Sequence, residues 1–419
     1  MGHSLHPNFV EDIALAVTRP SALLALDTSA STDVAAPVAR AVDATLRRAL
    51  ARRASDVHFE PSGDGGGRTR LRIDGIMQPG EPIARESYAA VVSRIKLLAG
   101  LDIANRRLPQ DGRYSVVVDS RRIDARVSSI PTLDGEKLVI RLLDHHVVLP
   151  RLDDLGMDAR ALASYRTVAH APWGFVVVSG PTGSGKTSTL YASIAELDRS
   201  ARNVCTVEDP VEARLADTSQ VQVNVRAGLT FPATLRSFVR QDPDVIMIGE
   251  IRDAETAAVG VSAALAGQTV FATVHSNDAP RTIDRLVELG VQRHSLAAAL
   301  TAVVAQRLVR KLCTACRQVE PVPAHLRSAF APAISTWFVA SACLVCDGTG
   351  YAGRTGVFEV LEVDDAVREA IAAGVPSATV AHIAAERGHR ALHHDAAAKI
   401  AAGATSFAEI ERVVGWWVR

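Results

Sequence analysis

Long apolar runs are missing from this chain of 419 residues. No stretch reaches the roughly 18 apolar residues that a membrane-spanning helix needs. The two longest candidates, residues 257–267 and 296–305, are short and rich in alanine, which is typical of buried helices. The N-terminus also lacks a cationic stretch followed by an apolar core, so we expect no secretory signal. These absences predict a soluble, cytoplasmic protein.

An excess of charge of one sign is also absent, and aromatic residues are few. Lysine and arginine together number 46, as do aspartate and glutamate, and aromatic residues make up 5% of the chain. A neutral chain argues against nucleic acid as the main partner, although it does not exclude a basic face on one domain. The length suffices for two or three domains, and the many alanines favour a helix-rich α/β protein.

A glycine-rich segment organises the rest of the chain. Residues 175–179 (FVVVS) have the apolar, β-branched character of a buried strand. Residues 180–187 (GPTGSGKT) match the phosphate-loop pattern G-x-x-x-x-G-K-[ST], and a helix-forming segment follows. A glycine-rich turn without a ligand is the alternative interpretation, but strand, loop and helix in this order are the context that the motif requires.

Such a loop binds phosphate groups through its backbone N–H groups and the positive end of the following helix. Lys186 would reach the β- and γ-phosphates, and the hydroxyl of Thr187 would bind Mg²⁺. We assign nucleotide binding to the whole segment, which comprises Gly180, Pro181, Thr182, Gly183, Ser184, Gly185, Lys186, Thr187 and Ser188.

Four predicted strands, each followed by a polar group, indicate one shared site. The strands cover residues 175–179, 204–207, 245–248 and 269–274. The groups that follow them are the phosphate loop, Glu208 with Asp209, Gly249 with Glu250, and His275. In an open parallel sheet, ligands bind outside the carboxyl ends of the strands, so we expect these groups to surround one ligand.

The strand ends supply what phosphoryl transfer to water requires, namely carboxylates and cations. We predict that Glu250 positions the attacking water. Gly249 stands where a Walker B strand usually carries aspartate, so the metal contact would come from Glu250, from Glu208 or Asp209, or through water. Glu208 and Asp209 could instead cap a helix or pair with an arginine. His275 is predicted to sense the γ-phosphate, and a hydrogen-bonded core histidine is the alternative.

Alternating segments predict an α+β domain over residues 33–145. Asp33 could cap a first helix, and a second helix is predicted over residues 88–101. The apolar stripe of the first helix comprises Val38, Val42, Leu46 and Leu50. Strands are predicted over residues 56–60, 69–73, 114–118, 122–128 and 137–143, with turns at 63–67, 74–75, 119–120 and 134–135.

Several arginines of this domain lie on predicted strands or loops: Arg107, Arg113, Arg122, Arg126 and Arg141. Arg122, Asp124 and Arg126 share one strand face, opposite the apolar residues 123, 125 and 127. Each arginine alone is most simply part of a solvated, salt-bridged sheet face. Together they could present cations to a nucleotide that the next domain or subunit holds.

Four of the five cysteines form two C-x-x-C pairs, Cys313 with Cys316 and Cys343 with Cys346. Two such pairs offer four thiolates to Zn²⁺ in a closed structural site, and we expect a small subdomain around residues 321–338 between them. Redox-active pairs are the alternative, which the glycine- and proline-rich surroundings disfavour. Cys205 lies in an apolar strand and is expected in the core.

The remaining boundaries follow from these motifs. Residues 1–32 show little periodicity and are predicted to form a weakly ordered leader. The other predicted segments are a linker over 146–159, a P-loop ATPase domain over 160–311, a tetracysteine zinc module over 312–352 and a C-terminal helical region over 353–419. The last begins with a strand over residues 357–361, and its pair His393 and His394 is expected on a solvated helix face rather than in a metal site.

Several stretches together carry a family resemblance: ASDVHFEP (54–61), LDIANRRLPQDGR (101–113), ARVSSIPTLDGEKLVIRLL (125–143), GPTGSGKTSTLY (180–191), TVEDPVE (206–212), GLTFPATLRSFVRQDPDVIMIGEIRD (228–253), TVHSNDAP (273–280), the four cysteines and GYAGRTGVFEVL (350–361). In this order they resemble the type II secretion and type IV pilus assembly ATPases, the GspE/PilB-like secretion ATPase superfamily. The resemblance covers residues 50–365. It implies a RecA-like P-loop NTPase domain preceded by an α+β (PAS-like) N-terminal domain, with a tetracysteine zinc subdomain and C-terminal helices.

The resemblance also implies function. Such a protein is a homohexameric ATPase that uses ATP, Mg²⁺ and Zn²⁺. It works on the cytoplasmic face of the inner membrane and drives pilin or pseudopilin assembly through platform and docking proteins. By motif, Glu208 lies in the Asp box, Glu250 in Walker B with the family's own Gly249, and His275 in the His box. Arg113 and its neighbours belong to the domain that closes over the nucleotide, so the implied catalytic set is Glu250, Glu208, His275 and Arg113.

Other functions remain open at this point. Pilus retraction ATPases resemble the core but usually lack the four cysteines, so the cysteines favour assembly or secretion. A nucleotide-gated scaffold with little hydrolysis is an alternative. Its support is the short segment before the region of resemblance, and Lys186 and Glu250 argue against it. A pilus or DNA-uptake motor of the same superfamily is a further alternative. A motor that moves DNA directly would need a basic channel, which the neutral charge disfavours.

Overall fold

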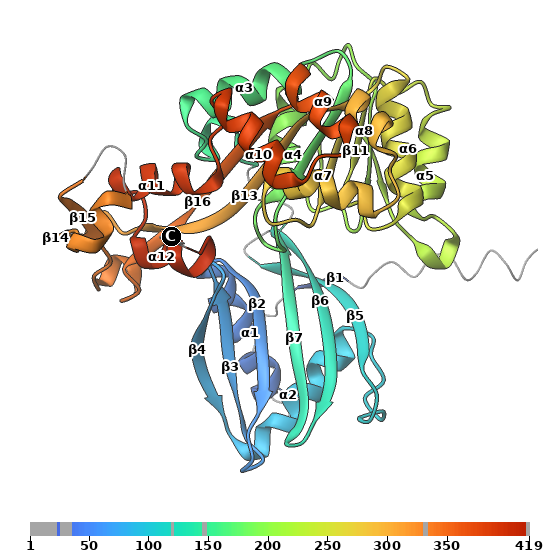
Figure 1. Cartoon of the computed structure of the whole chain (residues 1–419). Coiled ribbons are helices and arrows are strands. Elements are labelled where there is room, and N and C mark those ends of the chain that lie inside the picture. Colours follow the sequence, from blue (N-terminus) through green and yellow to red (C-terminus); the bar gives the residue numbers. More distant parts are fainter. Residues whose placement is uncertain (1–22, 26–35, 119–120, 145–148, 330–333, 416–419) are drawn as a thin grey trace, which may run out of the picture. The chain divides into compact units, whose positions relative to one another are not determined.

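The computed structural model describes residues 23–25, 36–118, 121–144, 149–329 and 334–415. The chain divides into two compact units, residues 1–147 and 148–419, each with its own sheet (Figure 1). Most of the predicted leader and the start of the predicted linker lie outside the described residues. None of the helices in these described ranges is both long and apolar enough to cross a membrane.

The first unit is a sheet covered by helices. Its strand order is β1-β5-β6-β7-β2-β3-β4, and neighbours are antiparallel except β1, which lies parallel to β5. Apolar side chains of α1 and α2 pack with those of the strands in one core. The elements are β1 (Leu23–Ala25), α1 (Ala36–Ala51), β2 (Ala54–Pro61), β3 (Gly67–Ile73), β4 (Ile76–Ile83), α2 (Arg85–Leu98), β5 (Gln110–Val118), β6 (Arg121–Thr132) and β7 (Gly135–Asp144).

Strand alternation decides which face of this sheet is buried. Ile123, Ala125 and Val127 of β6 belong to the core, whereas Arg122 and Arg126 are exposed. Neighbouring residues of a strand point to opposite faces, so the predicted polar strand face is confirmed. The ion pair between Arg122 and Asp124, at 3.5 Å, lies on that face.

The predicted hairpin after β3 is confirmed, together with a strand that the pattern does not predict. Asp74 and Gly75 both have positive φ, 48° and 81°, as a two-residue turn between twisted strands requires. The strand that follows, β4, contains Pro79 and Pro82, which are unfavourable in a central strand. Because β4 lies at the edge of the sheet, it accommodates both prolines.

The second unit has an α/β architecture, as predicted. Its strand order is β10-β9-β11-β12-β8-β13-β16, parallel throughout except for β16, which lies antiparallel to β13. The elements up to the end of this sheet are α3 (Ala159–Ala169), β8 (Gly174–Ser179), α4 (Lys186–Glu196), β9 (Val204–Glu208), β10 (Ser219–Gln222), α5 (Phe231–Phe238), β11 (Val245–Ile248), α6 (Ala254–Leu265), β12 (Thr269–Val274), α7 (Ala279–Glu288), α8 (Arg293–Ala299), β13 (Leu300–Leu312) and β16 (Tyr351–Glu362).

Both faces of this sheet are covered. Along β8, Phe175 and Val177 belong to a core shared with α6, α7 and α8, while Val176 and Val178 belong to a core shared with α3 and α4. A strand buried on both faces has no polar alternation, which is why it shows as an apolar run. The four strands predicted in this region are confirmed as β8, β9, β11 and β12, which are adjacent in the sheet.

The helical character expected for residues 296–305 is wrong beyond Ala299. From Leu300 the chain forms β13, which pairs with β8 on one side and β16 on the other. The β-branched Val303 and Val304 favour a strand, and pairing on both sides outweighs the alanine content. The other alanine-rich stretch, residues 257–267, is helical and lies mostly in α6.

The rest of the second unit follows β13. Its elements are β14 (Gln318–Pro321), a 3₁₀ helix (Ala324–Ala329), β15 (Thr336–Val339), a 3₁₀ turn (Leu344–Cys346), α9 (Asp365–Ala373), α10 (Ser377–Glu386), α11 (Leu392–Ala401) and α12 (Phe407–Val413). Trp337 of β15 stacks on Phe407 of α12 with ring centroids 5.1 Å apart. A small core shared by β13, β15, β16, α11 and α12 therefore ties the segment between the cysteine pairs to the C-terminal helices.

Candidate active site

The phosphate loop connects β8 to α4, and its glycines are required by its shape. Gly180, Gly183 and Gly185 have φ values of 149°, 78° and 88°, in the region that other residues rarely adopt. A Cβ on Gly180 would also lie 2.5 Å from the main-chain oxygen of Gln306. The loop can therefore adopt this conformation only with glycine at these positions.

Lys186 folds back over this loop. Its Nζ donates to the carbonyl oxygens of Gly180, at 2.8 Å, and Pro181, at 3.1 Å. Burial lowers the pKa of Lys186 to about 8, and the nearby charge of Glu250 opposes that change. The ammonium group is thus held at the loop with carbonyl oxygens as its partners.

Glu250 follows β11 and lies between the side chains of Arg252 and His275. Its Oε1 lies 2.8 Å from Nε2 of His275, and its Oε2 lies 2.6 Å from Nη2 of Arg252. Burial alone would raise the pKa of this carboxyl group, but the hydrogen bond from Arg252 and the positive charges of Arg252, His275 and Lys186 outweigh it. The pKa of Glu250 therefore lies below its usual value, and the group is a carboxylate at neutral pH.

His275 connects this carboxylate to the phosphate loop. Its Nδ1 lies 3.1 Å from the carbonyl oxygen of Gly180, which can only accept a hydrogen bond. Its Nε2 lies 2.8 Å from Oε1 of the Glu250 carboxylate. A cleft of about 660 Å³ adjoins the loop and is lined by Pro181, Thr182 and His275.

A close approach of two strands explains the glycine before Glu250. The N–H of Gly249 donates to the carbonyl oxygen of Val207 at 2.8 Å. A Cβ at position 249 would lie 3.1 Å from that oxygen and 3.2 Å from Cα of Glu208. Aspartate at this position would crowd β9, so the carboxylate of this strand end comes from the next residue.

A second carboxylate reaches the loop from the segment after β9. Thr187 Oγ1 donates to Glu212 Oε1 at 3.5 Å, and hydroxyl and carboxylate oxygens are ligands that Mg²⁺ prefers. The strand-end pattern does not single out Glu212, because it lies four residues beyond Glu208, the last residue of the strand. Its position as the final residue of the TVEDPVE motif is the signal that could have found it.

Glu208 has a different environment, because protein donors occupy its carboxylate. It is 2% exposed, and Oε1 accepts hydrogen bonds from Thr206 Oγ1 at 2.6 Å and from Gln220 Nε2 at 3.1 Å. Its Oε2 accepts from Tyr191 Oη. That hydroxyl oxygen in turn accepts from the backbone N–H of Glu212 at 3.1 Å. Glu208 thus orients Tyr191 and, through it, the segment that carries Glu212.

Other predicted site residues lie elsewhere. Asp209 is exposed at the end of β9. Arg113 is exposed on β5 of the first unit, where it pairs in register with Arg126 of β6. The approach of Arg113 to a nucleotide stays a prediction, because it concerns the second unit.

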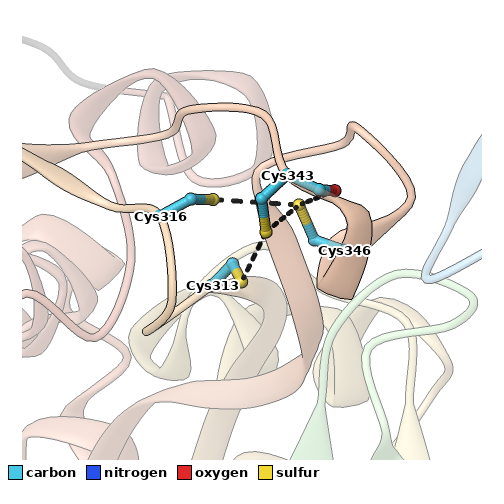
Figure 2. Close-up of side chains that lie close together, drawn as sticks. All are labelled: Cys313, Cys316, Cys343 and Cys346. Carbon is cyan, nitrogen blue, oxygen red and sulfur yellow. Dashed lines mark hydrogen bonds between the residues drawn. The ribbon is translucent and has the colours of Figure 1, made fainter.

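The four paired cysteines come together, as Figure 2 shows. Their sulfur atoms all lie within 4.8 Å of one another. The separations are 3.9 Å for Cys313 and Cys343, 3.8 Å for Cys316 and Cys346, and 3.6 Å for Cys343 and Cys346. A tetrahedral Zn²⁺ with bonds of about 2.3 Å needs sulfur atoms about 3.8 Å apart. The donor set and its spacing therefore fit zinc.

Two further predictions are confirmed. Cys205 is buried within β9, apart from this cluster. His393 and His394 are both exposed on α11, with ring centroids 4.1 Å apart.

Comparison with known proteins gives a consistent result. The family model described as Type II/IV secretion system protein matches residues 31–412. The type II secretion system protein HxcR of Pseudomonas aeruginosa is 46% identical over 378 residues, which cover 90% of this chain and 77% of that protein. The type IV pilus assembly ATPase PilB of Myxococcus xanthus is 43% identical over 387 residues, which cover 91% of this chain and 68% of that protein.

A solved structure shares the fold. The ATPase DotB of Legionella pneumophila aligns with a TM-score of 0.66 at 19% identity, covering 93% of this chain and 98% of that one. At this identity the likeness concerns the fold alone.

Proposed function

Because this chain belongs to the type II/IV secretion system protein family and is an ATPase of type II secretion or type IV pilus assembly, we propose that it works as a homohexameric motor that binds ATP at residues 180–188. The observation that carries this proposal is the Glu250 carboxylate, held between Arg252 and His275 beside an intact phosphate loop. ATP hydrolysis then supplies the free energy for assembly of pilin-like subunits.

Each residue has a role that follows from its position. Lys186 exchanges its carbonyl partners for the β- and γ-phosphates. Thr187 and Glu212 hold Mg²⁺, which neutralises phosphate charge when bound. Glu250 orients the attacking water, since its pKa keeps it ionised. His275, which donates to Gly180 at the loop, contacts the γ-phosphate.

Glu208 acts through Tyr191 rather than on the metal. Its oxygens already accept hydrogen bonds from Tyr191, Thr206 and Gln220, so a metal would have to displace them. Losing these bonds from a buried carboxylate is costly. We therefore assign Glu208 as a residue that positions Glu212.

The proposal also includes contacts between subunits, a zinc site and partner proteins at the membrane. Arg113 and the neighbouring arginines of the first unit approach the nucleotide when subunits assemble, and the four cysteines hold Zn²⁺. The motor acts on the cytoplasmic face of the inner membrane, through platform and docking proteins rather than nucleic acid. The resemblance described above supports these assignments, and the neutral charge supports the last one.

ATP hydrolysis measured against protein concentration, with Mg²⁺ present, tests the hexamer. If arginines act across subunits, specific activity rises steeply with concentration and levels off when assembly, followed by light scattering, is complete. Tight ATP binding without turnover in the assembled protein would contradict a motor and favour a nucleotide-gated scaffold.

The pKa of Lys186 predicts how nucleotide affinity depends on pH. Burial lowers this pKa to about 8, and the negative charge of a bound phosphate group would raise it. Below pH 8 the ammonium is already charged, so affinity is constant. Above pH 8 binding must take up a proton, so the affinity for ADP falls by up to about tenfold per pH unit. Calorimetry in two buffers of different ionisation enthalpy measures both the affinity and the proton uptake.

The matched control for this prediction is Lys186→Arg. A guanidinium group keeps its charge over the same pH range, so the variant should show no proton uptake and no loss of affinity above pH 8. An affinity of the unmodified protein that stays constant well above pH 8 would contradict the prediction.

A further inference from the structure

A buried amide group lies behind the phosphate loop. Gln306 belongs to β13 and is 1% exposed. Because Ala305 pairs with Ser179, the last residue of β8, Gln306 stands where the neighbouring strand gives way to the loop. No motif in the sequence points to this residue.

The amide of Gln306 links the phosphate loop to α4. Its Nε2 donates to the carbonyl oxygen of Ser184 at 2.6 Å, and its Oε1 accepts from the hydroxyl of Thr189 in α4 at 2.8 Å. A carbonyl oxygen can only accept, so the bond to Ser184 identifies Nε2 and fixes the orientation of the amide. The group uses its donor and its acceptor at the same time.

The loop also packs directly on Gln306. A Cβ on Gly180 would lie 2.5 Å from the main-chain oxygen of Gln306, and a Cβ on Gly185 would lie 3.1 Å from its Nε2. Both outer glycines of the motif are thus needed for this contact as well as for their backbone conformation. Gln306 therefore lies directly against the loop.

This contact determines where one N–H group of the loop points. The C=O of Ser184 and the N–H of Gly185 belong to one planar trans peptide, so they point in opposite directions. Because the carbonyl is held toward Gln306, the N–H of Gly185 is directed away from Gln306, and backbone N–H groups of such a loop bind phosphate in the proposed function. If the donor were lost, a buried carbonyl would have no partner and the peptide could rotate.

We propose that Gln306 is a positioning residue of this ATPase, which holds the Ser184–Gly185 peptide in the orientation that binds phosphate. The inference rests on the proposed function of the loop as the ATP site. It also explains why glutamine is needed. Glutamate has no donor for Ser184, methionine has neither donor nor acceptor, and asparagine is shorter by one methylene group.

The variants Gln306→Met and Gln306→Glu test this proposal. We expect each to bind ADP with Mg²⁺ about tenfold more weakly, because the loop must be reordered at the expense of one buried hydrogen bond. Amide hydrogen exchange of residues 180–187 in the nucleotide-free protein should become faster. Ser193→Ala is the matched control. Ser193 is also buried on α4 and donates to the Thr189 carbonyl at 2.7 Å, but it has no contact with the loop carbonyl. That variant should keep the ADP affinity within about twofold.

The outcomes distinguish a failure of the role proposed for Gln306 from a failure of the proposed ATP site. Gln306→Met with unchanged ADP affinity and unchanged loop exchange overturns the proposal. If Gln306→Met fails to fold, Gln306→Glu keeps the side-chain length and the acceptor for Thr189 but loses the donor to Ser184, and unchanged affinity and exchange there overturn the proposal equally. If the unmodified protein binds neither ATP nor ADP, the proposed function fails, while the exchange comparison still decides whether Gln306 holds the loop.

Discussion

Replacing Glu250 with glutamine should lower the rate of ATP hydrolysis roughly 10²–10⁴-fold, the contribution typical of a general base. The variant keeps the size of the side chain and removes the charge that we propose holds water against the γ-phosphate. ATP affinity should not fall, because Arg252 and His275 lose an anionic partner and the site becomes more positive. Turnover under saturating ATP and direct binding of a fluorescent ATP analogue measure the two effects separately.

Glu196→Gln is the matched control for this experiment. Glu196 lies at the end of α4 in the same unit and pairs with Arg166 at 2.7 Å, so the change removes a comparable ion pair away from the phosphate loop. Its turnover should equal that of the unmodified protein. If Glu250→Gln instead retains hydrolysis within a factor of about ten, another group activates the water, and Glu212→Gln becomes the next variant to measure.

If the four cysteines hold zinc as proposed, replacing Cys343 with alanine should release it and unfold the segment around the four sulfur atoms. A structural zinc site contributes on the order of 10 kcal/mol to the folding free energy of small peptides. The apolar core next to the four cysteines is small, so it cannot replace that contribution. The N–H of Cys313 donates to the carbonyl of Gly350 at 2.9 Å, and β13 and β16 begin their pairing there, with Leu312 opposite Tyr351. Loss of metal should therefore also loosen this end of the strand pair. Metal analysis and hydrogen exchange of residues 307–355 measure the two losses.

Cys205→Ala provides the control, because it removes a buried thiol from β9 without touching the cluster. It should keep one zinc ion per chain while losing a little stability from the smaller side chain. If zinc stays bound to the Cys343→Ala variant, the assignment of the four cysteines as zinc ligands is contradicted. It is also contradicted if the unmodified protein, purified without chelators, contains no zinc.

Most residues of the candidate active site could be predicted from the sequence. The phosphate loop could be predicted because its requirements are local: glycines for positive φ, followed by lysine and threonine at the start of a helix. Glu250 and His275 could be predicted because His275 directly follows one apolar strand, Glu250 follows another after a single glycine, and parallel strands end at one edge of the sheet. Glu212 could not be predicted in this way, because a loop separates it from its strand. Its contact with Thr187 depends on how that loop folds back.

The cysteine cluster could also be predicted only in part. The two C-x-x-C pairs identified the donor set, because the residues of each pair are close along the chain. Their convergence depends on the pairing of β13 with β16, and the sequence pattern alone did not predict that the alanine-rich start of β13 is a strand. Propensity was misleading here because the sheet supplies neighbours on both sides of β13.

What the sequence by itself determined is therefore the family, the α/β class, the phosphate loop, the strand-end groups and the zinc donors, all of which rest on motifs or periodicity within short stretches. The tertiary structure decided which group lies behind the loop, which carboxylate lies near Thr187, the proposed magnesium ligand, and which carboxylate orients a tyrosine. Gln306 and Ser184 are 122 residues apart, and no local pattern can encode such a hydrogen bond. It arises because a strand late in the chain is placed beside β8, so that one buried amide meets a carbonyl that would otherwise have no partner.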